Sequence, residues 1–507
     1  MRPTRPWQAL RSSDVTILLL LALLRILLHT LTNGQYGFHR DELATLDDAR
    51  HLAWGYVAYP PLTPFIGRIE LELFGTSLVG FRFFATVAQG VALVLTGLIA
   101  RELGGKRFAQ VVAALAVAIA PVSFASGTMF QYVSFDYLWW VLIAYLVIRL
   151  LKSEDPRWWV AIGAVIGLGM ETKYTMAFFV AGIVAGVVLT PARRYLKSPW
   201  LWCGIALSLL VFLPNFLWQV NHQFASLDML RSIHARDVRM GRAGGFLLGQ
   251  LWKCVVSVTV PLVVAGLYYY FVAPAGKRYR LVGWMYVIPL AVFFLAKGRD
   301  YYMSPAYPML LAAGAVWGEQ WLASLPPVRA AGWRRATWYA LAISGVLVAA
   351  VVLPIAPLNS TWWKVADRMN GNFNEEIGWP ELAANVAQIR DSLPAEDRAR
   401  LGILAGDVGE GGAINLYGPA YGLPRAISGM NSFWERGYGD PPPQTLILLG
   451  FQHDFAERTF QRCELVGRQS NPFGIKNSTT EGYTDIFVCR GLRQPWPEFW
   501  AQFRYFG

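Results

Sequence analysis

Charged residues are scarce in this sequence. They make up 15% of its 507 residues, while 55% are hydrophobic, and this balance is too apolar for soluble domains of that combined length. Apolar runs recur between residues 15 and 357. Their lengths, roughly 18 to 25 residues, match the requirement for crossing a hydrocarbon core of about 30 Å. The composition therefore predicts a polytopic α-helical membrane protein.

Several motifs of other protein classes are absent. The six histidines show no metal-ligand spacing, and no P-loop or GxGxxG pattern occurs, so no nucleotide-sugar site is visible. No internal repeat of the kind common in secondary transporters is detectable. The formal charge of +12 could suggest nucleic-acid binding, but the lysines and arginines are spread over short loops rather than gathered on one face. Membrane topology explains this basic excess better, and we expect no nucleic-acid partner.

Cysteine is also rare, with four residues in the chain. Cys203 and Cys254 lie in apolar runs and are expected in the core, whereas Cys463 and Cys489 flank the last segments of the C-terminal region. In an oxidising compartment the second pair could form a disulfide. Two buried thiols are equally consistent with the sequence.

The loop charges predict an orientation in the membrane. The positive-inside rule assigns the N-terminus, with Arg2, Arg5 and Arg11, to the cytoplasm. Five further loops are assigned to the inside. Four of them are net positive, residues 101–107, 193–197, 277–280 and 329–335, and in the fifth, residues 152–157, two basic and two acidic residues balance. Eleven expected helices keep this alternation: 15–33, 78–100, 108–124, 136–151, 158–172, 174–191, 200–220, 246–272, 281–297, 305–322 and 336–357. The basic loop 231–242 falls outside, so either the rule is overridden there or this loop binds an anion.

The pattern divides the chain into two domains. Residues 1–357 form the predicted transmembrane module, and its first outer loop, 34–77, contains a helical apolar pattern that predicts an amphipathic helix on the membrane surface. That pattern consists of Leu43, Leu46, Ala49 and Leu52. Residues 358–507 are predicted to form an extracytoplasmic α/β domain. Its expected elements are a helix at 380–393, strands at 401–405, 445–449 and 485–488, and an aromatic end at 496–506 that could rest on the headgroup layer.

Short polar turns between the apolar helices, here called corners, fall on the predicted outer side of the membrane. Asp41 and Glu42 are neighbouring carboxylates, suited to deprotonating a hydroxyl or holding a divalent cation, although helix capping is an alternative that fits Asp41. Asp136 opens a later helix, where capping is again the alternative.

Cations and phenols occupy two further corners. Lys173 and Arg299, with Tyr301 and Tyr302, could hold a phosphate or pyrophosphate at headgroup depth. An aromatic belt that anchors the protein in the interface is the alternative for the two tyrosines. Because several such corners fall on one side, we favour a site over independent anchors.

The order of these features resembles a known family. The chain is similar to the polyprenyl-phosphate-sugar-dependent glycosyltransferases of the GT-C fold in six features that occur in the same order. These are an apolar first helix, the Asp-Glu pair, Gly-Tyr-Val-x-x-Pro-Pro-Leu from Gly55, a later Asp, Lys-Tyr, and Tyr-Tyr-x-x-Pro-Ala-Tyr-Pro from Tyr301. Protein O-mannosyltransferases and lipid A aminoarabinose transferases belong to this group. The resemblance covers residues 15–325 best.

The resemblance implies an inverting glycosyltransferase in the inner membrane. It would transfer a sugar from a polyprenyl-phosphate carrier to a lipid, glycan or protein acceptor on the outer face. Asp41 would be the general base with Glu42 beside it, and Asp136 would match a second acid. The carrier phosphate would be received by Lys173, Arg299, Tyr301 and Tyr302. The loop Tyr59-Pro60-Pro61 would border the substrate, and Tyr59 stands where aminoarabinose-type relatives have lysine.

Two other functions remain open at this point. A transporter or flippase for a lipid-linked sugar is one, although transporters tend to place ionisable groups near the midplane of repeated halves. A non-catalytic receptor or assembly factor that acts through residues 358–507 is the other.

Overall fold

The computed structural model describes residues 13–242 and 244–507, so the predicted cytoplasmic Arg2, Arg5 and Arg11 lie outside the described residues. The chain divides into two compact units. The helical unit comprises the described part of Met1–Asn33 together with Arg82–Val220 and Arg236–Leu353. The mixed unit comprises Gly34–Phe81, Asn221–Ala235 and Pro354–Gly507. The predicted boundary at residue 357 stays a prediction, but the first outer loop packs in the same unit as the C-terminal region.

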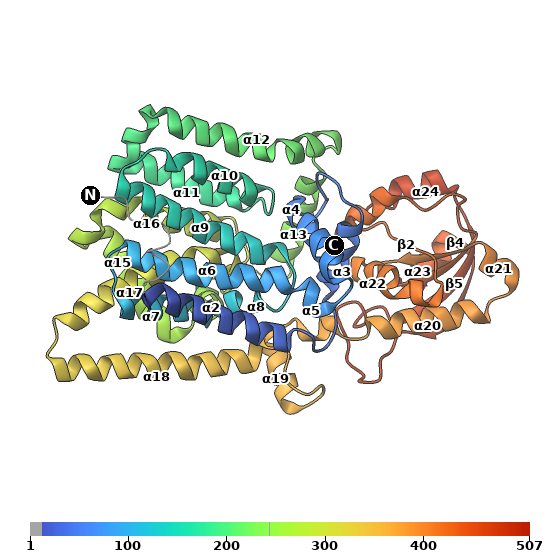
Figure 1. Ribbon diagram of the computed structural model, residues 1–507. Coiled ribbons are helices and arrows are strands. Elements are labelled where there is room, and N and C mark those ends of the chain that lie inside the picture. Colours follow the sequence, from blue (N-terminus) through green and yellow to red (C-terminus); the bar gives the residue numbers. More distant parts are fainter. Residues whose placement is uncertain (1–12, 243) are drawn as a thin grey trace. The chain divides into compact units, whose positions relative to one another are not determined.

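The helical unit is built from apolar helices, and its longer helices lie side by side (Figure 1). In chain order they are α2 (Ser13–Thr32), α6 (Phe83–Glu102), α7 (Arg107–Ala118), α8 (Pro121–Ala125), α9 (Tyr132–Ser153), α10 (Trp158–Met170), α11 (Met176–Leu189), α12 (Pro199–Asn221), α14 (Phe246–Gly249), α15 (Val260–Phe271), α16 (Arg280–Leu295), α17 (Tyr307–Ala323) and α18 (Pro327–Val352). Short turns connect them: η1 (Pro191–Lys197), η2 (Gln250–Cys254), η3 (Ser257–Thr259), η4 (Pro274–Tyr279) and η5 (Asp300–Ala306). Helix α13 (Ala225–Arg239) crosses the boundary between the two units.

The expected count of eleven membrane spans is not confirmed. Among the described residues, six helices are long and apolar enough to cross a membrane, or up to eight if each of two bent pairs counts as one span. Each predicted range does contain a helix, but α7 and α10 are short, and the predicted helix 246–272 is broken, with a bend of 93°. Periodicity identified the apolar segments, whereas tertiary packing decided where each helix stops.

Glycines allow close packing between helices of this unit. In α15 a Cβ added at Gly266 would lie 2.2 Å from the Leu310 carbonyl oxygen of α17. In α17 a Cβ at Gly314 would lie 1.9 Å from the Leu262 carbonyl oxygen. Small residues let apolar helices approach through their backbones, which drives packing where water gives no hydrophobic force.

The loops that were assigned to one side of the membrane do lie together. Ion pairs join Arg107 to Asp14, Lys152 to Glu102, and both Arg194 and Arg278 to Glu154. These pairs connect four of the predicted inner loops to each other and to the start of α2. These four loops therefore lie together, while the alternation of the spans and the side of the membrane that these loops face stay predictions.

The mixed unit contains a five-stranded sheet. Its strands are β1 (Leu401–Ala405), β2 (Ala426–Ile427), β3 (Thr445–Leu449), β4 (Phe460–Arg468) and β5 (Asp485–Leu492), in the order β2-β1-β3-β5-β4. The pairs β1–β2 and β1–β3 are parallel, and β3–β5 and β4–β5 are antiparallel. Three of these strands and the helix at 380–393 were predicted correctly; β2 and the exposed β4 were not.

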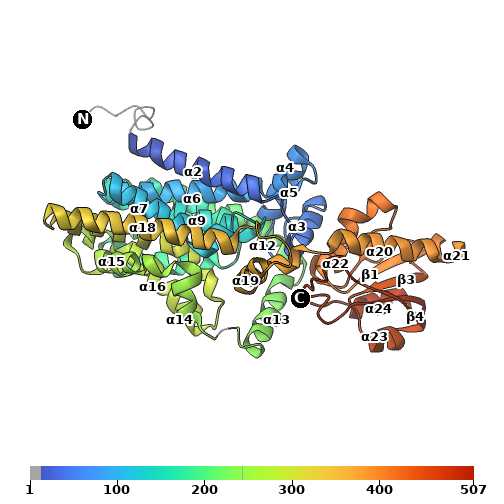
Figure 2. The ribbon, with the colours of Figure 1, turned by 90° about the horizontal axis from the view of Figure 1, so that it is seen from below.

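Helices cover both faces of the sheet (Figure 2). One face carries α20 (Trp379–Ser392) and α22 (Val408–Tyr417), and the other carries α23 (His453–Thr459) and α24 (Trp496–Gln502). The remaining elements are α3 (Arg40–Arg50), α4 (Leu62–Phe74), α5 (Leu78–Phe81), α19 (Thr361–Asn370), η6 (Phe373–Glu376), α21 (Ala395–Ala399), η7 (Gly418–Tyr421) and η8 (Asn431–Arg436). The aromatic end was expected on the headgroup layer, but Phe499, Trp500 and Phe503 are buried against the sheet.

The predicted surface helix in the first outer loop is also corrected. Leu43, Leu46 and Ala49 of α3 are buried, because this face packs on α22, where a Cβ at Gly412 would lie 2.7 Å from the Leu43 carbonyl. The exposed apolar face of this loop belongs to α4 instead, with Phe65, Ile69 and Leu73. An apolar stripe thus predicted a buried face, and the sequence alone did not show that protein rather than lipid covers it.

Candidate functional site

Lys173 lies at the centre of a buried polar cluster in the helical unit. It follows α10 in a short non-helical turn, and 10% of its side chain is exposed. Its Nζ lies 3.8 Å from Asp136 Oδ2, and Asp136 also accepts a hydrogen bond of 3.0 Å from Trp140 Nε1. Asp136 does not cap α9, whose N-cap is Gln131. The structure thus pairs two of the predicted site residues and removes the capping interpretation of Asp136.

Three tyrosine rings surround the same ammonium group. Lys173 Nζ lies 4.0 Å from the ring centroid of Tyr302, 5.2 Å from that of Tyr132 and 5.8 Å from that of Tyr301. Ring faces attract a cation, more strongly where water is excluded. The three tyrosines therefore belong to one cluster around Lys173, and a role of Tyr301 and Tyr302 in phosphate binding stays a prediction. Tyr132 was missed because a lone tyrosine at a helix start carries no sequence signal.

Arg299 joins the cluster from the turn before η5. Its Nε donates to Asp237 Oδ2 over 2.6 Å, and its Nη1 donates to the Tyr301 hydroxyl over 3.3 Å. Asp237 also pairs with Arg242 at 3.3 Å. Each of the two predicted phosphate-binding cations therefore already has a carboxylate neighbour, which stabilises its charge at a partly buried position.

Asp237 lies within the basic segment 231–242 and pairs with arginines of that segment. In addition to Arg242 and Arg299, it faces Arg236 at 3.7 Å, and Arg231 pairs with Asp228 at 3.3 Å. Asp237 within the segment and Asp228 before it thus offset part of its basic charge. The sequence could not reveal that Asp237 collects arginines from two different loops.

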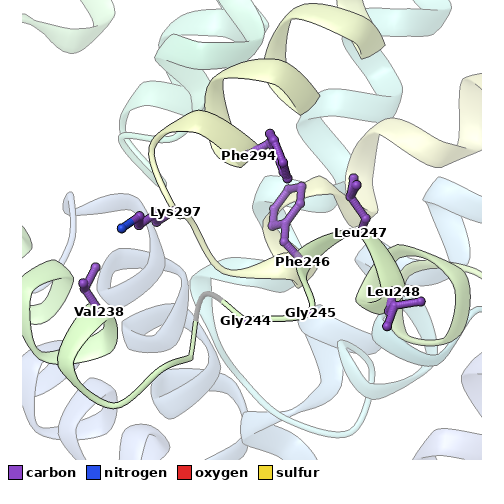
Figure 3. Close-up of a pocket in the computed structure, with 8 residues that line it drawn as sticks. All are labelled: Val238, Gly244, Gly245, Phe246, Leu247, Leu248, Phe294 and Lys297. Carbon is purple, nitrogen blue, oxygen red and sulfur yellow. The ribbon is translucent and has the colours of Figure 1, made fainter.

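A cavity of about 530 Å³ lies beside this region (Figure 3). Val238, Gly244, Gly245, Phe246, Leu247, Leu248, Phe294 and Lys297 line it. The rings of Phe246 and Phe294 face each other, and Lys297 is the one cation among the lining residues. Lys297 is only two residues from Arg299 in the chain. The cavity therefore offers a mainly apolar space next to a segment that carries cations.

The acid pair lies in the mixed unit, at the start of α3. Glu42 is fully buried, and its Oε2 accepts a 2.8 Å hydrogen bond from the backbone N–H of His39. His39 Nδ1 in turn accepts one of 3.0 Å from the backbone N–H of Asp41. Helix capping was the alternative to a catalytic role for Asp41, but the capping box of α3 is formed by His39 and Glu42. The side chain of Asp41 is 47% exposed, so it is the carboxylate of the pair that faces solvent.

Arg40 connects Asp41 to the C-terminal region of the same unit. Its guanidinium lies 3.6 Å from the Asp41 carboxylate and 3.8 Å from that of Asp407, and it donates to Ser478 Oγ over 2.7 Å. Burial raises the pKa of Asp407, and Arg40 acts in the opposite direction. Arg40 was not singled out from the sequence, because two of its partners, Asp407 and Ser478, are more than 360 residues away.

A second buried network holds the other end of α3. Arg436 contacts the carboxylates of both Asp47 and Asp48, and Tyr59 donates its hydroxyl to Asp48 Oδ2 over 2.6 Å. One guanidinium thus faces two carboxylates, and burial raises the pKa of Asp48 to about 8. Tyr59, Pro60 and the following Pro61 are buried, and Pro61 is the N-cap of α4. The Tyr59 hydroxyl thus joins the first outer loop to α3 through Asp48, and the prediction that residues 59–61 border the substrate stays a prediction.

The structure thus brings together one of the two predicted sets. Asp136, Lys173, Arg299, Tyr301 and Tyr302 form one cluster in the helical unit, whereas Asp41 and Glu42 belong to the mixed unit. That the two sets act in a single site stays a prediction. Across residues 13–242 and 244–507, no group of three or more His, Cys, Asp or Glu side chains is arranged to hold a metal ion.

Comparison with known proteins agrees with this architecture. Residues 58–218 match the model of the dolichyl-phosphate-mannose-protein mannosyltransferase family. The chain is 26% identical over 205 residues to lipid A galacturonosyltransferase RgtD of Rhizobium johnstonii, covering 38% of the chain and 41% of that protein. It is 28% identical over 279 residues to undecaprenyl phosphate-alpha-4-amino-4-deoxy-L-arabinose arabinosyl transferase 1 of Pseudomonas fluorescens, covering 50% of the chain and 47% of that protein. The chain therefore spans less than half the length of the curated relatives that it matches.

The fold is similar to a solved structure along nearly the whole chain. ArnT from Cupriavidus metallidurans bound to undecaprenyl phosphate aligns with a TM-score of 0.53 at 16% identity, covering 94% of this chain and 97% of that one. The apo state of the same protein aligns with a TM-score of 0.52 at 15% identity. These similarities confirm the resemblance to glycosyltransferases of the GT-C fold.

Proposed function

We propose, starting from this GT-C fold, that the chain is an inverting glycosyltransferase. It moves a sugar from a polyprenyl-phosphate carrier to a lipid, glycan or protein acceptor at the outer face of the inner membrane. The name of one relative, a lipid A galacturonosyltransferase, favours an envelope lipid related to lipid A as the acceptor, and the name of the other favours an undecaprenyl-phosphate sugar as the donor. The observation that carries the proposal is the cluster of Lys173, Arg299 and tyrosines in the helical unit.

The cluster suits the leaving group of such a reaction. A lipid monophosphate is already anionic at neutral pH, so its departure requires positive charge rather than a proton. Lys173 supplies a compact charge and Arg299 a planar fork that matches phosphate oxygens. Their neighbours Asp136 and Asp237 keep them charged and in position before the carrier binds. The cavity at Phe246 and Phe294 offers apolar walls for the carrier's hydrocarbon chain.

Asp41 is the proposed general base. It stands half exposed at the first turn of a helix whose start is fixed by the capping box of His39 and Glu42. In the reaction, Asp41 takes the proton of the acceptor hydroxyl as its oxygen bonds to the anomeric carbon. The bond between that carbon and the phosphate oxygen breaks, and the electron pair leaves with the phosphate. Attack opposite the leaving group inverts the configuration at the anomeric carbon.

A disulfide supports the proposed orientation. Cys463 and Cys489 face each other on the neighbouring strands β4 and β5 and are bonded. Disulfides persist in oxidising compartments and are rare in the cytosol. We therefore place the mixed unit outside the cytoplasm and the N-terminus inside it, in a multi-pass inner-membrane protein.

The test is transfer by the purified full chain in proteoliposomes that contain a polyprenyl-phosphate sugar and lipid A. Wild-type protein should attach the sugar to the acceptor, and Asp41→Asn should abolish transfer while the protein stays folded. Asp228→Asn, in the same unit with a side chain that is 56% exposed, is the matched control and should leave transfer unchanged. Full transfer by Asp41→Asn would remove Asp41 from the role of base.

A further inference from the structure

Helix α19 has two apolar faces, one buried in the mixed unit and one partly exposed. Trp363 and Ala366 are buried in a cluster with Phe373, Ile377 and other residues of the mixed unit. On the neighbouring face, Trp362 is 43% exposed, Val365 49% and Met369 68%. The spacing of these three side chains places them on one stripe of the helix.

The helix itself is firmly built. The Ser360 hydroxyl accepts a 3.0 Å hydrogen bond from the backbone N–H of Trp363. Gly371 ends the helix in the left-handed conformation, with φ of 71°. Its exposed stripe is therefore a property of a fixed helix and not of a loose loop. Exposure of a tryptophan, a valine and a methionine to water is unfavourable, by about 25 cal/mol for each Å² of apolar surface.

The charges beside the stripe are positive. Lys364 and Arg368 are both exposed. The acid of the helix, Asp367, is turned to the protein, where its Oδ1 accepts a 3.0 Å hydrogen bond from the backbone N–H of Asn374. An apolar stripe with basic residues next to it is the pattern of a helix that lies in the interface of an anionic membrane.

The chain keeps this helix close to the bilayer. Helix α18 is long and apolar enough to span the membrane and ends at Val352, and α19 begins at Thr361. The link of residues 353–360 can extend at most ~28 Å, at ~3.5 Å per residue. Within it Ala356 is buried, and its carbonyl accepts a 2.6 Å hydrogen bond from the Tyr36 hydroxyl, which shortens the reach further.

We propose that α19 is an interfacial helix that inserts Trp362, Val365 and Met369 into an anionic lipid leaflet. Lys364 and Arg368 then face the lipid phosphates, and the mixed unit is held to the bilayer independently of its substrates. A second copy of the chain fits the stripe less well. A stable protein interface needs about 800 Å² from each partner, which is more than one face of a ten-residue helix provides.

The experiment measures the depth of a fluorophore in the full chain, reconstituted in vesicles of phosphatidylglycerol and phosphatidylcholine. With Cys203→Ser as background, Val365→Cys carries an environment-sensitive dye, and nitroxide-labelled acyl chains are the quencher. The matched control is the same dye at Glu457→Cys on α23, where the side chain is 65% exposed. We expect blue-shifted emission and strong lipid quenching at residue 365, and little quenching at residue 457.

Charge reversal and dilution complete the test. Lys364→Glu with Arg368→Glu should reduce quenching at residue 365 in anionic vesicles and leave it unchanged in purely zwitterionic ones. Equal quenching at residues 365 and 457 would overturn the proposal. So would a blue shift at residue 365 without lipid quenching that disappears when the chain is diluted to one copy per vesicle, because a second copy would then cover the stripe.

Discussion

Removing the charge of Lys173 separates its contribution to folding from its proposed contribution to carrier binding. Its Nζ lies 3.8 Å from Asp136, and both side chains are at least nine-tenths buried. At this separation two unit charges attract by about 4 kcal/mol when the effective dielectric constant is about 20. Breaking a buried pair by removing one partner costs about 3–5 kcal/mol, because the other charge is left without compensation. Lys173→Met should therefore lower the free energy of unfolding by about this amount.

The double variant Lys173→Met/Asp136→Asn should recover most of that loss, because no buried charge is left unpaired. Carrier binding should behave differently. A charge-assisted contact contributes about 1.5–3 kcal/mol, so the single and the double variant should both bind polyprenyl phosphate about 10- to 100-fold more weakly. Thermal unfolding in detergent measures the change in stability, and a titration with polyprenyl phosphate measures the change in carrier affinity.

Lys152→Met is the matched control for these variants. Lys152 also pairs with an acid in the helical unit, at 3.0 Å from Glu102, but in the set of loops predicted on the opposite side. Its substitution should leave carrier affinity unchanged. Wild-type affinity in the double variant would refute the reasoning, because Lys173 would then serve the packing of the helices and not the phosphate.

Three further predictions concern other parts of the molecule. Arg299→Gln should raise the apparent KM for the carrier by about 10- to 100-fold, with a smaller effect on kcat. The control Arg278→Gln removes an arginine that pairs with Glu154 and should change neither constant. Equal changes in KM for the two variants would contradict a phosphate-binding role of Arg299. Cys463→Ser should lower the stability of the mixed unit by about 3 kcal/mol, the value for a loop of this length, and the cysteine pair should resist alkylation in the untreated wild type. Burial raises the pKa of Asp48 from 3.8 to about 8, so the folded state favours the protonated carboxyl. The free energy of unfolding should therefore fall as pH rises from 3.8 towards 8, and Asp48→Asn should reduce this dependence on pH in thermal unfolding. An unchanged dependence on pH in the variant would assign the effect to other groups.

Local pattern predicted much of the fold. The apolar runs located the six helices that are long and apolar enough to span a membrane among the described residues, although α4 and α13 were not predicted. Short β-like runs separated by glycine and proline located β1 and β3 to the residue. The sequence pattern could not show which part of the protein, or whether lipid, covers each apolar face. The stripe of Leu43 and Leu46 faces α22, which follows more than 350 residues later, and no local signal distinguishes such a face from one that meets lipid.

The candidate site shows the same division. Lys173, Asp136 and Arg299 were found because ionisable residues at the ends of apolar helices are costly and therefore informative. Their partners Asp237 and Tyr132, and the links Arg40 and Arg436 that hold α3, were not found. Each of these four residues acts through a contact between distant segments of the chain. A single polar residue in a loop gives no sequence signal that identifies its contact partner.

The central claim is covalent transfer of a sugar from a lipid carrier, and mass spectrometry of the cell envelope tests it most directly. Lipids, glycans and proteins are compared between cells that carry the wild-type chain and cells that carry Asp41→Asn. The account predicts one acceptor that is heavier by a sugar residue in wild-type cells alone. Acceptors of identical mass in the two strains, with the lipid-linked sugar moved across the membrane by both proteins, would contradict it and favour a flippase.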